Sequence, residues 1–164
     1  MADIYRVYIS NRQNIIKIPI GLRMMVRRSC NAALKINGFF GSAEVNVIFT
    51  DNSYIQSLNE QYRNKNSPTD VLSFPASKDG EFEINPEIGT KILGDIVVSL
   101  EMACERSRKL DNDLQREVVF LVVHGMLHLL GYDHEGNSLE KGKMKELEER
   151  ILASIGFPEV EVYV

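Results

Sequence analysis

The chain has 164 residues, of which 44% are apolar and 26% charged, with a formal net charge of −4. These proportions are those of a globular protein, and they exclude fibrous and wholly disordered classes. The length predicts a single domain over residues 1–164, large enough to bury about two-thirds of its unfolded surface without staples.

The charge is distributed unevenly along the chain. Residues 1–40 carry seven basic side chains against one acidic side chain, a local charge of +6, so the remaining 124 residues carry −10. A basic end on an acidic body can bind a polyanion locally. A solvated helix face explains the same arginines, and the charge pattern alone favours that simpler explanation.

The cysteines and the start of the chain indicate a cellular compartment. Cys30 and Cys104 are too few for a disulfide framework, and we expect both thiols to be buried and inert in a reducing compartment. Charges near Met1 leave no room for the apolar run of a signal peptide. The longest apolar stretch, 118–123, is shorter than the about 20 residues that cross a bilayer. We therefore expect a soluble, cytoplasmic protein with no membrane partner.

The hydrophobic pattern predicts strands and helices that alternate irregularly. Strands are expected at residues 4–9, 44–50, 71–74 and 92–99, the last of them central. Helices are expected at residues 19–36, 53–62, 100–109, 114–130 and 138–155, with a surface loop at 76–90. This order predicts an α+β fold, or an α/β fold with a mixed sheet, in which a mixed β-sheet packs against helices. Helix 114–130 is apolar on nearly every side and should be the buried central one.

All three histidines of the chain lie within eleven residues, at His124, His128 and His134. On a helix, the first two are about 40° apart around the axis and about 6 Å apart along it, so both rings can face one ion. Gly131 can adopt the left-handed conformation that ends a helix, which would bring His134 back to the same ion. The spacing is that of metzincin zinc sites, and it predicts that these three residues bind a metal.

Three imidazole ligands favour a catalytic rather than a structural ion. They leave Zn²⁺ its full charge and a fourth position for water, whose pKa falls to about 7. Structural zinc usually takes four protein ligands, often cysteine, and Cys104 lies on another predicted helix. Histidines that only satisfy core hydrogen bonds are the alternative, and three of them at this spacing make it the weaker one.

The residue after His124 argues against a peptidase. In H-E-x-x-H peptidases a glutamate at this position is the general base, whereas this chain has Gly125. Peptide hydrolysis would need a carboxylate from another segment. Asp133 and Glu135 flank His134, where they either orient the ligands or are simply solvated.

Three segments together resemble the YbeY family of metal-dependent endoribonucleases, which act as rRNA maturation factors. Residues 124–134, H-G-M-L-H-L-L-G-Y-D-H, follow the signature of that family without a departure. The second match combines Leu58-Asn59 and Tyr62-Arg63 with the run T-D-V-L-S-F-P at 69–75, and the third is L-G-D-I at 93–96. They span residues 58–134, about half of the chain.

The resemblance implies one zinc ion per chain, held by His124, His128 and His134 in a single α+β domain. It implies hydrolysis of phosphodiester bonds in single-stranded RNA, small-subunit rRNA 3′-end maturation and ribosome quality control. The implied partners are rRNA, the small ribosomal subunit, ribosomal proteins and assembly GTPases. It also implies that Arg63 is essential, with His124, for catalysis. A guanidinium can bind phosphate in bidentate fashion and stabilise pentacoordinate phosphorus. Without the resemblance, Arg63 would be taken for a surface residue at a helix end.

Asp70 and Asp95 are weaker candidates, and we leave both out of the catalytic set. Asp70 starts a strand after a Pro-containing loop, where a turn or cap role is expected. Asp95 lies within an apolar strand and would need a partner such as Arg63 or a histidine ring. The basic N-terminal region could follow the RNA backbone.

Two other functions stay open at this point. One is a non-catalytic ribosome assembly factor whose metal only braces the end of a helix. The other is a metal-dependent hydrolase of another substrate, such as a peptide.

Overall fold

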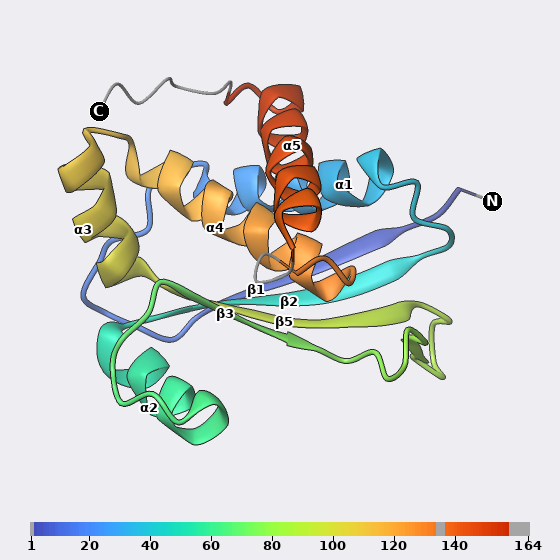
Figure 1. Ribbon diagram of the computed structural model, residues 1–164, viewed down its shortest axis with the longest axis horizontal. Helices are drawn as coiled ribbons and strands as arrows, with labels where there is room; N and C mark the ends of the chain where they lie inside the picture. The colour runs from blue at the N-terminus through green and yellow to red at the C-terminus, as the bar shows by residue number, and fades with distance from the viewer. Residues whose placement is uncertain (1, 134–136, 158–164) are drawn as a thin grey trace.

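The computed structural model describes residues 2–133 and 137–157 and shows one mixed β-sheet with helices on both faces (Figure 1). The strands are β1 (Tyr5–Asn11), β2 (Ala43–Thr50), β3 (Val71–Pro75), β4 (Glu83–Ile84) and β5 (Lys91–Ser99). The helices are α1 (Leu22–Ile36), α2 (Asn52–Arg63), α3 (Leu100–Leu110), α4 (Leu114–Leu129) and α5 (Ser138–Ser154). The predicted α+β class with a mixed sheet is confirmed.

The strand order is β1-β2-β5-β3, which puts β5 in the interior of the sheet as predicted. β1, β2 and β5 run parallel, whereas β3 pairs antiparallel with β5 and forms an edge. The two-residue strand β4 also pairs with β5, and it falls in the segment that was predicted to be only a loop. Both of its residues are exposed, so no hydrophobic alternation marks it in the sequence.

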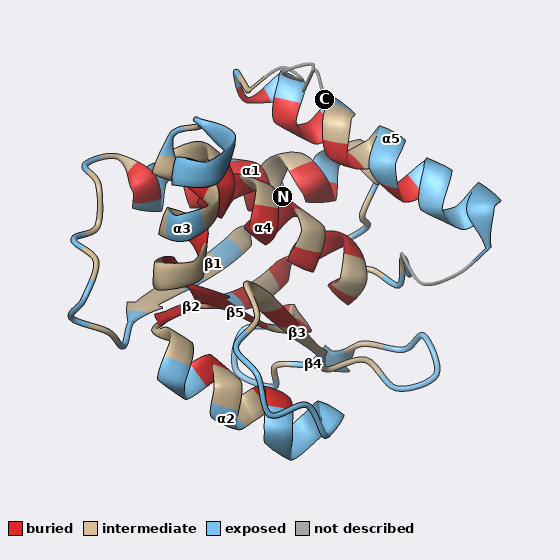
Figure 2. Ribbon diagram, turned by 60° about the vertical axis from the view of Figure 1, so that its left-hand side comes forward, coloured by how far each residue is buried: buried red, intermediate tan, exposed pale blue. Residues whose placement is uncertain are grey.

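The two faces of the sheet are covered unequally. Alternate residues of β2, namely Val45, Val47 and Phe49, point into the main core beneath the helical layer of α1 and α4. Only α2 covers the other face, over a small cluster around Ile55 and Val97 (Figures 1 and 2). The face of the sheet that α2 covers is therefore partly open.

Helix α4 is the buried central helix that the sequence predicts (Figure 2). It ends in a turn at Gly131, which has a φ of +101°. The Gly131 N–H donates to the His128 carbonyl, and the Tyr132 N–H donates to the Leu127 carbonyl, both at 3.0 Å. This is the Schellman arrangement, in which a left-handed glycine closes a helix, so the predicted turn is confirmed.

Two smaller expectations need correction. Helix α1 begins at Leu22 rather than at Pro19, because Gly21 adopts a φ of +88° and forms the N-cap. Burial is confirmed for Cys30, where desolvation raises the pKa of the thiol to about 12, but Cys104 is partly exposed. In the part of the chain that is described, the helices are all too short or too polar to cross a membrane.

Candidate active site

Helix α4 presents two histidines, His124 and His128, on the only side of the helix that is not packed in the core. They lie one turn apart, and their Nε2 atoms are 3.1 Å from each other. Two nitrogens bound tetrahedrally to one zinc ion at about 2.0–2.1 Å lie about 3.3 Å apart. The pair therefore has the spacing of two ligands that share an ion.

A carboxylate from α5 fixes the orientation of one ring. Oε1 of Glu148 lies 2.6 Å from Nδ1 of His124, and Glu148 is only 8% exposed. A carboxylate that accepts the Nδ1–H keeps Nε2 as the unprotonated nitrogen, which is the one that can bind a metal. This arrangement of carboxylate, histidine and metal recurs in zinc proteins.

The residues expected to orient the ligands were Asp133 and Glu135, beside His134, and Glu148 was not predicted. The signal that could have found it is its position in α5. Met144, Glu148 and Ile151 lie on one face of the helix at intervals of four and three residues, and all three are buried. A carboxylate on an apolar face requires a partner.

The third predicted ligand, His134, lies outside the described residues. The same holds for Glu135. Within 2–133 and 137–157, no further histidine, cysteine or carboxylate joins the pair as a three-residue metal cluster. Convergence of three histidines stays a prediction, while the turn at Gly131 that it requires is present.

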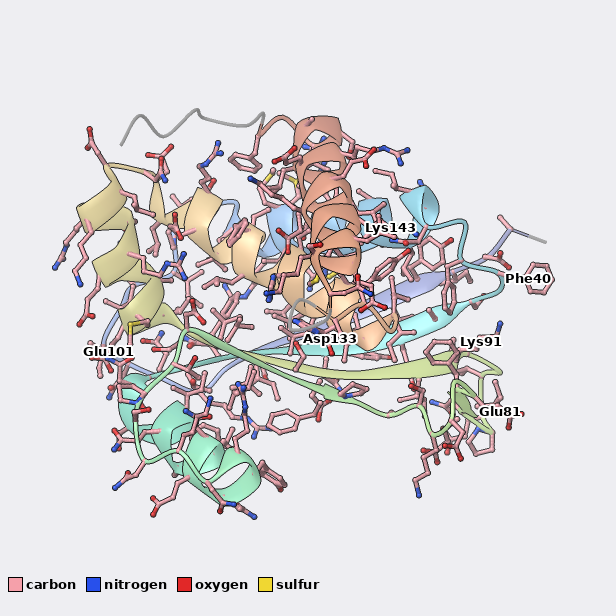
Figure 3. All side chains as sticks on the ribbon, in the orientation of Figure 1. Phe40, Glu81, Lys91, Glu101, Asp133 and Lys143 are labelled. Carbon is pink, nitrogen blue, oxygen red and sulfur yellow. The ribbon has the colours of Figure 1, made fainter. Side chains whose placement is uncertain are left out.

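His124 and His128 line a cleft of about 590 Å³ that faces the C-terminal end of α2. Arg63, the last residue of α2, lines the opposite side, together with Tyr62 and residues 69–75. Asp133, labelled in Figure 3, lines the cleft where α4 meets the sheet. The structure thus brings Arg63 to the same cleft as the two histidines, 61 and 65 residues away in sequence.

The structure explains why Gly125 follows His124. A Cβ added to Gly125 would lie 2.8 Å from Cγ2 of Ile96 and 3.0 Å from Oγ of Ser73. This position of α4 faces the sheet and is fully packed, so a glutamate there has no space. The peptidase general base is therefore excluded at this position by packing.

The two aspartates have different surroundings. The Asp70 carboxylate accepts the Val71 N–H at 2.8 Å and pairs with Arg106, which ties β3 to α3. This fits the local role expected of Asp70, although it also lines the cleft. The partner expected for Asp95 is wrong: its carboxylate accepts a hydrogen bond from Nδ2 of Asn46 at 3.0 Å.

The orientation of Asp95 follows from that of its neighbour in β5. Ile96, the residue after Asp95, faces α4, because a Cβ added to Gly125 of that helix would lie 2.8 Å from Cγ2 of Ile96. Since successive strand residues point to opposite faces, Asp95 points away from the histidines.

A second cavity of about 710 Å³ adjoins the cleft at His124 and lies between α3, α4 and α5. Four basic side chains line it: Arg106, Arg116, Lys141 and Lys145. We call it the basic cavity. Three carboxylates also line it: Asp70, paired with Arg106, Glu148, bonded to His124, and Glu149. None of the basic residues of 1–40 lines the cleft or the basic cavity, so the positive charge at the site comes from other helices.

Comparison with known proteins identifies one family. The family model described as Endoribonuclease YbeY matches residues 8–156. An Endoribonuclease YbeY of Syntrophomonas wolfei is 42% identical, covering 90% of this chain and 95% of that protein. One from Oceanobacillus iheyensis is 46% identical, covering 80% and 86%. The solution structure of TM1509 from Thermotoga maritima has a TM-score of 0.58 at 26% identity, covering 92% of this chain and 91% of the other.

Proposed function

The chain belongs to the Endoribonuclease YbeY family, and from this premise we propose that it is a zinc-dependent endoribonuclease specific for single-stranded RNA. We further propose that it acts in the cytoplasm on small-subunit rRNA, in 3′-end maturation and in ribosome quality control. Its partners there would be the small subunit, ribosomal proteins and assembly GTPases. The observation that supports the chemistry is the pair of Nε2 atoms, 3.1 Å apart, opposite Arg63 in one cleft.

His124, His128 and His134 would hold the zinc ion in this proposal. A bound zinc ion supplies a Lewis acid for a phosphoryl oxygen and lowers the pKa of water to about 7. Glu148 holds the proton at Nδ1 of His124, and this fixes the ring and its tautomer. The chemistry of the described donor set fits the ion, because neutral imidazoles are ordinary zinc ligands.

Arg63 would bind the phosphate group that is cleaved. A guanidinium can donate two parallel hydrogen bonds to phosphate oxygens and can stabilise the charge that develops at phosphorus. Arg63 enters from α2, on the other side of the cleft from the histidines. A scissile phosphate would therefore be held between a cation of the protein and the histidine pair.

The basic cavity supports a polyanionic substrate. Its positive charge adjoins His124, so RNA phosphates next to the scissile one would meet Arg116, Lys141 and Lys145. We propose this cavity, in place of the N-terminal region, as the path of the RNA backbone on that side.

The test is cleavage of a labelled single-stranded RNA by the wild-type protein and by His124→Ala, with zinc content measured on both. We expect cleavage and about one zinc per chain in the wild type, and loss of both in the variant. A duplex of the same sequence is the control substrate. Undiminished cleavage by His124→Ala would contradict the proposal. Ribosome association without any cleavage would instead favour a non-catalytic assembly factor.

A further inference from the structure

We propose that a groove on the far face of the sheet binds unpaired bases of the RNA strand that passes through the cleft. The proposal rests on the proposed function and adds a subsite for the substrate. The groove has a volume of about 690 Å³ and lies where α2 leaves the sheet uncovered. We call it the tyrosine groove, because Tyr8 of β1 and Tyr54 and Tyr62 of α2 line it.

These three rings are unusually accessible for large side chains. Tyr8 is 47% exposed, Tyr54 40% and Tyr62 61%. Single exposed apolar residues are common on protein surfaces, but a cluster around one concavity marks a binding site. The apolar side chains of Ile48 and Val97 also line the groove. Rings around an apolar surface suit flat, partly apolar groups.

The charges in the groove favour bases over phosphates. Asp95 lies in the groove, where its carboxylate would repel phosphate but can accept hydrogen bonds from base amino groups. Asn46, which donates to Asp95, adds an amide that can both donate and accept. Arg12 is the basic residue of the groove, and it suits a neighbouring phosphate. Bases in a duplex are already stacked and paired, so this surface selects single strands.

The tyrosine groove adjoins the cleft. Tyr62 and Phe74 line both, and their rings meet edge to face with centroids 5.1 Å apart. The two hollows adjoin at β3, the edge strand of the sheet, to which Phe74 belongs. On its other side, the cleft shares Asp70, Val71 and His124 with the basic cavity.

The cleft with the histidine pair therefore lies between the tyrosine groove and the basic cavity, and it shares lining residues with each. An enzyme that cuts inside an RNA chain must bind nucleotides on both sides of the scissile bond. The basic cavity would hold the backbone on one side, and the tyrosine groove would hold bases on the other. The protein would then bind RNA on both sides of the scissile bond.

The experiment measures RNA binding by the full chain with Tyr8→Ala and Tyr54→Ala combined. All proteins carry His128→Ala so that the RNA stays intact, and affinity is measured by fluorescence anisotropy with a labelled single-stranded RNA. Neither tyrosine is buried, so the fold should tolerate both changes. Phe40→Ala is the matched control, since Phe40 is 85% exposed and lies at the opposite end of the sheet from α2 (Figure 3).

We expect the double variant to bind single-stranded RNA at least about tenfold more weakly, because each ring lost removes a stacking partner. Phe40→Ala should bind like the parent protein. An RNA with abasic sites should bind the parent and the double variant equally, because it offers no bases to stack.

Equal affinity of the parent and the double variant for the intact strand would overturn the proposal and favour a protein partner for the groove. If the wild-type protein neither binds nor cleaves RNA, the proposed function fails, and the subsite with it.

Discussion

The two sides of the cleft are held in place by very different amounts of packing. Ten of the sixteen residues of α4 are buried, whereas only two of the twelve residues of α2 are. Helix α4 places His124 and His128 from inside the core, while α2 places Arg63 at an exposed helix end. The histidine side of the cleft is therefore part of the main core, whereas the arginine side belongs to a helix with few buried residues.

This difference has a chemical reason. Metal ligands must stay within a few tenths of an ångström of their positions, which a packed helix provides. A guanidinium that binds a phosphate needs reach and orientation, and a long side chain at a helix end supplies both. Substitutions on the α2 side should therefore change activity alone, whereas those on the α4 side should also change stability.

Arg63→Ala should have the largest effect on activity. We expect the kcat/KM for single-stranded RNA to fall about 10²–10³-fold, as for other residues that stabilise transition-state charge. The free energy of unfolding in urea should change by less than about 0.5 kcal/mol, because the side chain is exposed. Lys65→Ala, an exposed cation two residues further on, is the control and should leave both values unchanged. If Arg63→Ala also lost several kcal/mol in the free energy of unfolding, the α2 side of the cleft would be as closely packed as the α4 side.

Gly125→Ala tests the packed side. The added Cβ would lie 2.8 Å from Ile96, inside the core, so we expect a loss of about 1–3 kcal/mol in the free energy of unfolding. Gly142→Ala is the matched control, because that glycine is also helical and has nothing within 4 Å. It should stabilise the protein by about 0.5–1 kcal/mol through helix propensity. Equal denaturation midpoints for the two variants would show that α4 is not closely packed on the sheet.

Gly131→Ala tests how the packed side ends. Alanine at a φ of +101° should cost about 1–2 kcal/mol in the free energy of unfolding. Gly38→Ala, at a φ of +64° and also with open space around it, should cost a similar amount. Only Gly131→Ala should also weaken zinc binding, because the chain beyond it leads to His134. The measurement is a zinc titration of both variants. Equal zinc affinity would show that the turn at Gly131 does not contribute to zinc binding.

Local patterns predicted most of this molecule. Hydrophobic periodicity located the main strands and helices, and the spacing of His124 and His128 with Gly131 located the paired rings and the turn. Local patterns failed where three-dimensional contacts decide. Strand β4 has no apolar face to reveal it, and Glu148 approaches His124 only because α5 crosses α4. Asp95 was expected to need a partner such as Arg63 or a histidine ring, but Ile96 faces α4, so Asp95 points to the other face and bonds to Asn46.

Glu148→Gln should have the smallest of these effects, and it tests whether the packed side extends to α5. Glutamine keeps the size of the side chain but replaces a charged acceptor of the Nδ1–H of His124 by a neutral one. Removing such a supporting carboxylate costs about 10–100-fold in metal affinity, and because the amide oxygen can still accept, we expect about tenfold. Glu146→Gln, an exposed carboxylate on the same helix, should leave zinc affinity unchanged in the same competition titration. If both variants bind zinc equally well, Glu148 serves packing alone, and the histidines are oriented by α4 itself.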